Sequence, residues 1–194
     1  MSYDLLLRRM RPERSMFDIE ITDSQDHLTL DPDFLRQVVE TTLGMEEVAA
    51  ATVSLALIDD PAIHDLNRRF LEHDYPTDVL SFLLESEVSH EHNEANDDRP
   101  GCGLRLEGEV IVSTETAARA AAEFLWNPLD EVTLYVVHGL LHLVGYDDHA
   151  ETDRQRMRDR ERAVLQTWGL TPHYSESTSV CSDSASKSET GDHR

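Results

Sequence analysis

The stretch HGLLHLVGYDDH, residues 138–149, decides how this sequence is interpreted, because it holds three histidines in one short, mainly apolar segment. His138 and His142 are four positions apart, so on a helix both side chains lie on one face and can reach the same metal ion. Gly145 predicts the end of that helix, and after the turn His149 can return to supply a third ligand. Three protein ligands with an open fourth position are typical of a catalytic zinc site.

The same helix lacks the general base of the metalloprotease pattern H-E-x-x-H. Gly139 holds the position of that glutamate and cannot accept a proton. Activation of water would therefore depend on the metal itself, on another carboxylate or on the substrate. Cysteine ligands are not expected, because Cys102 and Cys181 stand alone in polar stretches. The pattern predicts a metal-dependent hydrolase and argues against an ordinary metalloprotease.

The composition limits the possible partners. The chain has 194 residues and a formal net charge of −22 at pH 7, and its length predicts one domain with a sizeable core. The acidity argues against a basic surface that binds nucleic acid nonspecifically, and we expect no DNA partner. With no membrane-length apolar run, no signal peptide pattern and isolated cysteines, we expect a cytoplasmic protein without a membrane partner.

Composition also changes along the chain. We expect a loose leader over residues 1–15, a metal-dependent hydrolase domain over 16–170, and a disordered tail rich in Ser, Thr and Asp over 171–194. Within the domain, residues 85–103 are acidic and poor in apolar groups, so they are expected to form a mobile loop insertion.

Hydrophobic periodicity predicts the secondary structure of the domain. Strands are expected at residues 17–21, 53–58, 78–83 and 109–113. Helices are expected to open at Asp31-Pro32, with Asp31 as the N-cap, and at Asp60-Pro61, and to span residues 114–126, 129–144 and about 150–167. In the second helix, the residues expected to face the core are Ile63, Leu66, Asn67 and Phe70. These elements predict a single α+β domain, with a small mixed sheet packed with about five helices.

Several segments, in the same order along the chain, resemble the YbeY family of bacterial zinc-dependent endoribonucleases. The matching segments are Leu66-Asn67, Asp74, residues 76–82 (PTDVLSF), residues 108–111 (GEVI), residues 138–147 (HGLLHLVGYD), and the pair Met157 and Glu161. They are similar to the family's L-N…D-x-P-T-D-V-L-S-F block, its G-D-I strand, its metal helix and the M-x-x-x-E of its last helix. The resemblance covers roughly residues 50–165.

The resemblance implies properties that composition and spacing do not. It implies a fold distantly like that of the metzincins, with one zinc ion per chain held by His138, His142 and His149 as catalytic ligands. It implies cleavage of single-stranded rRNA in late 3′-end maturation of small-subunit 16S rRNA, and a role in ribosome quality control. The partners that it implies are proteins of the small ribosomal subunit or an assembly GTPase.

The chain departs from the family at the third ligand. The family spaces its histidines H-x3-H-x5-H, whereas one extra residue stands before His149 here. Without a gap in the alignment Asp148 takes the third position, and a carboxylate is an acceptable zinc ligand. We favour His149, because a turn can absorb one inserted residue. Asp147 or Asp148 then either orients a ligand or takes a proton, and the alternative is that they cap the turn.

A second departure concerns contact with RNA. The family usually carries an arginine before its P-T-D block, and Leu71 occupies that position here. Arg69 is a candidate substitute, and a solvated surface arginine is the alternative. The arginines of the last helix are interspersed with acids, which predicts a solvated face rather than a phosphate track. They are Arg154, Arg156, Arg158, Arg160 and Arg162.

Two other functions fit the same residues. A metal-dependent peptide hydrolase would share the metal helix, although it would lack the usual glutamate base. A ribosome-assembly factor with structural zinc and weak catalysis would explain Leu71.

Overall fold

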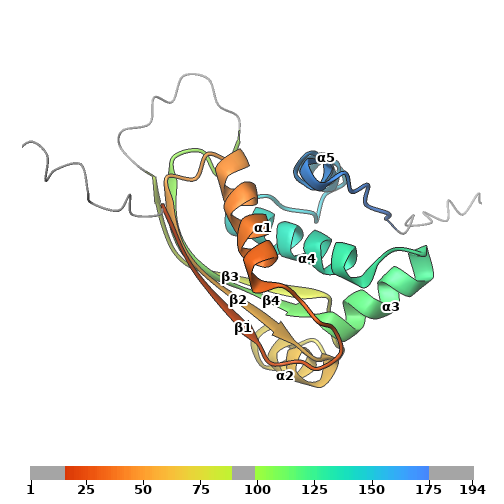
Figure 1. The fold of residues 1–194 in the computed structure, drawn as a ribbon. Helices are drawn as coiled ribbons and strands as arrows, with labels where there is room; N and C mark the ends of the chain where they lie inside the picture. Colours follow the sequence, from red (N-terminus) through yellow and green to blue (C-terminus); the bar gives the residue numbers. More distant parts are fainter. Residues whose placement is uncertain (1–15, 89–98, 175–194) are drawn as a thin grey trace, which may run out of the picture.

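A four-stranded mixed sheet forms the centre of the structure, a computed structural model that describes residues 16–88 and 99–174 (Figure 1). The strands are β1 (Phe17–Asp23), β2 (Ala50–Ile58), β3 (Val79–Val88) and β4 (Leu104–Ser113). Their order is β1-β2-β4-β3. β1 and β4 pair parallel to β2, and β3 pairs antiparallel to β4 at one edge.

Five α-helices accompany this sheet in the described part of the chain. They are α1 (Pro32–Met45), α2 (Asp60–Leu71), α3 (Thr114–Phe124), α4 (Pro128–Leu143) and α5 (Glu151–Leu165), followed by the short 3-10 helix η2 (Gln166–Trp168). In Figure 1, α1 and α4 lie on one side of the sheet, α2 lies on the other, and α5 packs beyond α4. The predicted α+β fold with a small mixed sheet is confirmed.

Local signals in the sequence begin the helices where expected. Asp31 caps α1 by accepting a hydrogen bond from the backbone N–H of Asp33, and Pro32 occupies the first turn. α2 begins at Asp60, as predicted, and its N-cap is Asp59, whose carboxylate accepts from the N–H of Ala62. The helix with the two histidines, α4, ends at Leu143, and Gly145 has a positive φ of 102°, which favours glycine.

Gly139 allows α4 to approach the sheet closely. A Cβ atom at this position would lie 2.7 Å from Cγ1 of Val110 and 3.0 Å from Oγ of Ser81, so any larger side chain would push the helix away. The Ser81 hydroxyl also donates a hydrogen bond of 3.0 Å to the carbonyl of Gly139. Packing therefore explains why the position of the protease glutamate holds glycine here.

The predicted loop over residues 85–103 is too long. Residues 85–88 belong to β3, where Glu85 pairs with Glu107 and Val88 pairs with Leu104. β4 correspondingly begins at Leu104, earlier than predicted. Pairing between the two strands supplies the backbone hydrogen bonds, so acidic side chains on the exposed part of β3 do not end the strand. Residues 89–98 of the predicted loop lie outside the described residues.

The prediction that Phe70 faces the core is wrong. Its side chain is 64% exposed and packs edge-on against Phe82, with ring centroids 5.5 Å apart. Ile63 and Asn67 of the same helix are buried as predicted. The contacts of α2 with β3, β4 and α3 cover only one narrow stripe of the helix.

At its C-terminal end, the described chain continues past the predicted boundary at residue 170. Residues 171–174 pack against α5 and the turn before α4, and Tyr174 is half-buried there. The predicted leader at residues 1–15 and the remainder of the tail, residues 175–194, lie outside the described residues. Among the residues that the structure describes, no helix is long and apolar enough to cross a membrane.

Candidate metal centre

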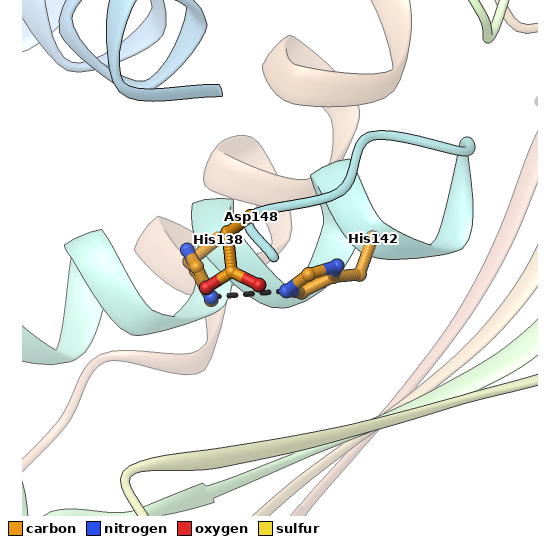
Figure 2. A group of neighbouring side chains, drawn as sticks. All are labelled: His138, His142 and Asp148. Atoms are coloured by element: carbon orange, nitrogen blue, oxygen red, sulfur yellow. Dashed lines mark hydrogen bonds between the residues drawn. The ribbon is translucent and has the colours of Figure 1, made fainter. Parts of the chain in front are cut away.

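The two histidines of α4 face each other, as their spacing predicts. The Nε2 atoms of His138 and His142 lie 3.1 Å apart (Figure 2). Two nitrogens bound to one zinc ion in tetrahedral geometry would lie roughly 3.3 Å apart. Burial of α4 over most of its surface fixes the backbone that carries both rings.

The third group beside this pair is Asp148. Figure 2 shows its carboxylate next to both rings, and one ligand atom from each of the three residues lies within 4.8 Å of the other two. The side chain of His149 is 87% exposed and is bonded through Nδ1 to Asp147 instead. The structure therefore brings together His138, His142 and Asp148. Contrary to the expectation from the sequence, it does not bring His149 to the pair.

Asp147 caps the turn after α4. Its Oδ1 accepts hydrogen bonds from the backbone N–H groups of Asp148, at 2.7 Å, and of His149, at 3.2 Å. The bond from the His149 ring to Asp147 lowers the pKa of the Asp147 carboxyl and raises the pKa of His149. These contacts turn His149 outward and leave Asp148 facing the helix, so the capping interpretation of Asp147 is confirmed.

A hydrogen bond on Nδ1 determines the tautomer of each ring. Nδ1 of His142 lies 3.0 Å from the carbonyl oxygen of Tyr146, which only accepts, so this nitrogen carries the proton. Nδ1 of His138 lies 2.6 Å from Oε1 of Glu161, which is 2% exposed and also acts as an acceptor. When both rings are neutral, both Nε2 atoms carry lone pairs that face each other. Two such lone pairs repel each other unless a metal ion or a proton lies between them, and two imidazoles with a carboxylate suit zinc.

Burial and charge act differently on the two rings. Burial lowers the pKa of His142, and the neighbouring His138 lowers it further. Burial also lowers the pKa of His138, but the hydrogen bond and negative charge of Glu161 outweigh that effect, so the pKa of His138 is raised. In the metal-free protein, protonation is therefore favoured at His138 over His142.

A buried ionic cluster fixes the turn that carries Tyr146. The Tyr146 hydroxyl donates a hydrogen bond of 2.9 Å to Oε2 of Glu46, which is fully buried at the end of α1. Arg160 of α5 donates to the other oxygen of Glu46 at 2.8 Å. Burial raises the pKa of Tyr146 to about 12, so its hydroxyl remains a donor. Sequence reasoning missed Glu46, because nothing in its local pattern marks a contact with residues so far along the chain.

A pocket of about 370 Å³ opens beside His138 and Asp148. Its lining includes Tyr135, Arg154, Arg158 and Tyr174. A wider hollow of about 790 Å³ lies over the sheet near Glu85 and Glu107, but none of the histidines lines it. We therefore associate the smaller pocket with the metal centre.

The arginines named from the sequence point in different directions. Arg154 and Arg158 line the pocket, whereas Arg160 binds Glu46. Arg69 does not line the pocket and forms an ion pair of 2.5 Å with Asp65 on its own helix. Leu71, at the position of the family's arginine, is 47% exposed.

Comparison with known proteins identifies the family. A family model described as Endoribonuclease YbeY matches residues 19–169. The chain belongs to the YbeY family. This membership confirms the resemblance drawn from the sequence motifs.

Relatives named Endoribonuclease YbeY match most of this YbeY-family chain. The protein of Carboxydothermus hydrogenoformans is 38% identical over 154 residues, which cover 78% of this chain and 97% of the relative. The protein of Moorella thermoacetica is 42% identical over 137 residues, covering 70% and 85% of the two chains. A solution structure from Thermotoga maritima matches with a TM-score of 0.48 and 24% identity, over 77% of this chain and 91% of that chain.

Proposed function

We propose that this YbeY-family chain is a zinc-dependent endoribonuclease that cleaves single-stranded rRNA. The observation that carries the proposal is the pair of facing Nε2 atoms, 3.1 Å apart beside a carboxylate, in a family whose relatives are named endoribonucleases. We further propose that the reaction serves late 3′-end maturation of 16S rRNA and ribosome quality control, in the cytoplasm.

We propose one zinc ion per chain, held by His138, His142 and Asp148. The positions of the three ligand atoms support this set, and so do the outer partners of both imidazoles. His149 was the expected third ligand, but its contact with Asp147 turns it into solvent. Binding of zinc by His149 would require this contact to break, so the gap-free alignment is the simpler assignment.

Zinc at this position would supply Lewis-acid activation of a nucleophile and of a phosphoryl oxygen. The chain's own residues would hold the ligands and place the RNA. In the neutral rings, Glu161 and the carbonyl of Tyr146 hold the proton on Nδ1, so that the Nε2 lone pairs of both rings face the metal site. Arg154 and Arg158 line the adjoining pocket, together with the carboxylates of Asp78, Glu123, Glu131 and Glu161. A phosphate bound there would therefore depend on these two guanidinium groups.

The overall charge of −22 supports a role for partners in RNA binding. Repulsion between this charge and the RNA backbone would weaken the encounter with free RNA. A basic protein of the small ribosomal subunit, or an assembly GTPase, could dock on the acidic surface and bring the rRNA to the pocket.

The test measures metal content and RNA cleavage together, on a single-stranded fragment of 16S rRNA. We expect about one zinc ion per chain in the wild type, as a single three-ligand site requires. His142→Ala and Asp148→Ala should lose zinc and cleavage, whereas His149→Ala should retain both. His64→Ala is the matched control, because His64 lies on α2, bonds to Asp74 just after that helix, and neither lines the pocket nor joins the candidate metal ligands. If His149→Ala loses zinc and Asp148→Ala keeps it, the ligand assignment is wrong.

A ribosome-assembly factor with structural zinc is the second candidate, and the exposed Leu71 favours it. Wild-type protein that binds zinc and ribosomal subunits but leaves RNA intact would support this candidate. Removal of a structural zinc ion should also unfold the domain, whereas removal of a catalytic one should leave it folded.

A further inference from the structure

The last described residues form a strap across the site. The ring of His173 stacks on Phe124 with centroids 6.3 Å apart, and it meets Trp126 edge-on at 5.7 Å. The guanidinium groups of Arg158 and Arg162 lie 4.5 Å and 5.1 Å from the centre of the Tyr174 ring. These contacts join the turn between α3 and α4 to α5, and they hold Tyr174 in one orientation.

The hydroxyl of Tyr174 reaches the carboxylate behind the metal centre. It lies 2.6 Å from Oε2 of Glu161, while Oε1 of the same carboxylate lies 2.6 Å from Nδ1 of His138. Glu161 is 2% exposed, so solvent does not compete for either oxygen. One buried carboxylate therefore links Tyr174 to His138, with a separate oxygen for each.

The direction of these bonds determines what Tyr174 can do. Burial raises the pKa of Tyr174, so its hydroxyl keeps its proton and donates to Glu161. A carboxylate that accepts on both oxygens cannot rotate without losing one charge-assisted bond. The orientation of Oε1, and with it the orientation of the His138 ring, is therefore tied to Tyr174.

We propose that Tyr174 is a positioning residue of the metal centre, which fixes Glu161 so that Nε2 of His138 faces His142 and Asp148. The inference rests on the proposed metal site. It assigns a role to the strap, because residues 171–174 then contribute to metal affinity in addition to packing.

The first test compares Tyr174→Phe with Tyr75→Phe in the full chain, by zinc titration against a competing chelator. Each variant loses one hydroxyl, but Tyr75 is 55% exposed and stacks on His73, away from the centre. We expect Tyr174→Phe to bind zinc about 10-fold more weakly, at the low end of the loss seen when outer partners of a ligand are removed. Tyr75→Phe should bind zinc like the wild type.

A cobalt-substituted sample separates positioning from packing. Tyr174→Phe should shift the visible absorption bands of bound Co²⁺, because these bands follow the geometry of the ligands, and Tyr75→Phe should leave them unchanged. If Tyr174→Phe lowers only the stability of the metal-free protein, while zinc affinity and the cobalt bands stay as in the wild type, the proposal is overturned.

A double-mutant cycle with Glu161→Gln tests the route of the effect. If Tyr174 acts through Glu161, the double variant should bind zinc no more weakly than Glu161→Gln alone; fully additive losses would overturn the proposal. None of these measurements uses RNA. A wild type that binds zinc without cleaving RNA would therefore contradict the proposed function and leave this inference standing, whereas a wild type that binds no metal would overturn both.

Discussion

The two histidines of the proposed metal centre are supported in different ways. Nδ1 of His142 donates to the carbonyl of Tyr146, four residues along the chain, within the same helix-to-turn segment. Nδ1 of His138 donates to Glu161, which lies 23 residues away on α5. The partner of His142 is a backbone carbonyl in the same segment, so it forms with the local fold. The partner of His138 is a side chain, and it requires α5 to pack against α4. One face of the centre is therefore built locally and the other by tertiary packing.

The largest loss of stability is expected from removing Glu46, which binds Tyr146 and Arg160 in the buried cluster next to the turn. Glu46→Ala leaves Arg160 and the Tyr146 hydroxyl without their buried partner. We expect the free energy of unfolding to fall by about 3 kcal/mol, the lower end for a broken buried ion pair, because Arg160 is partly exposed. Urea unfolding measures this loss. Glu40→Ala, an exposed glutamate on the same helix, is the control and should change the free energy of unfolding by less than about 0.5 kcal/mol.

Loss of Glu161, the side-chain partner of His138, should weaken zinc binding more than loss of the Tyr146 hydroxyl. Glu161→Ala removes the partner of His138, and we expect zinc affinity to fall by about 10- to 100-fold, or about 1.4–2.7 kcal/mol. Titration with a chelator measures the affinity, and Glu151→Ala on the exposed start of α5 is the control. An unchanged affinity would show that His138 does not need its carboxylate partner.

Tyr146→Phe separates the effect of the side chain from that of the backbone, because it removes the hydroxyl that binds Glu46 and keeps the carbonyl that His142 uses. We expect a loss of about 1–2 kcal/mol in the free energy of unfolding, from the buried acceptor left on Glu46. Zinc affinity should change by less than about 2-fold, since this outer partner of the ligand is retained. A large loss of affinity would mean that the local support is as fragile as the tertiary one.

The smallest effect is a pH dependence of opposite sign at the two rings in the metal-free protein. The folded-state pKa of His142 is lowered, so its contribution to stability is present above the unfolded pKa and is lost as the pH falls. The folded-state pKa of His138 is raised, so its contribution is present below the unfolded pKa and is lost as the pH rises through the folded value. Urea unfolding at pH values below and above the reference pKa of His measures how the free energy of unfolding depends on pH. Relative to the wild type, His138→Gln and His142→Gln should change this pH dependence in opposite directions. If both variants change the pH dependence of stability in the same direction, the opposite pKa shifts of the two rings are contradicted.

Parts of the fold and of the site could be predicted from short stretches of sequence. The pairing of His138 with His142 follows from helical periodicity, and the end of α4 follows from Gly145. The capped start of α1 at Asp31-Pro32 follows from equally local chemistry. The order of several family motifs was enough to indicate the YbeY family, which the comparisons confirm.

Other features depend on contacts between distant segments. The extension of β3 over residues 85–88 requires its pairing with β4, and the exposure of Phe70 reflects how little of α2 is covered. That Asp148 rather than His149 lies beside the two rings depends on how Asp147 caps the turn, and the spacing of residues along the sequence does not reveal this.

The sequence by itself determined the fold class, the family and the two histidines on one helix face. Helical periodicity places the two histidines on one face, the order of short motifs indicates the family, and the predicted strands and helices together indicate the fold class. The tertiary structure alone decided that Glu161 and Tyr174 stand behind His138 and that Glu46 holds the turn behind His142. These groups come from different elements, and only the packing of α1, α4 and α5 determines which side chains meet.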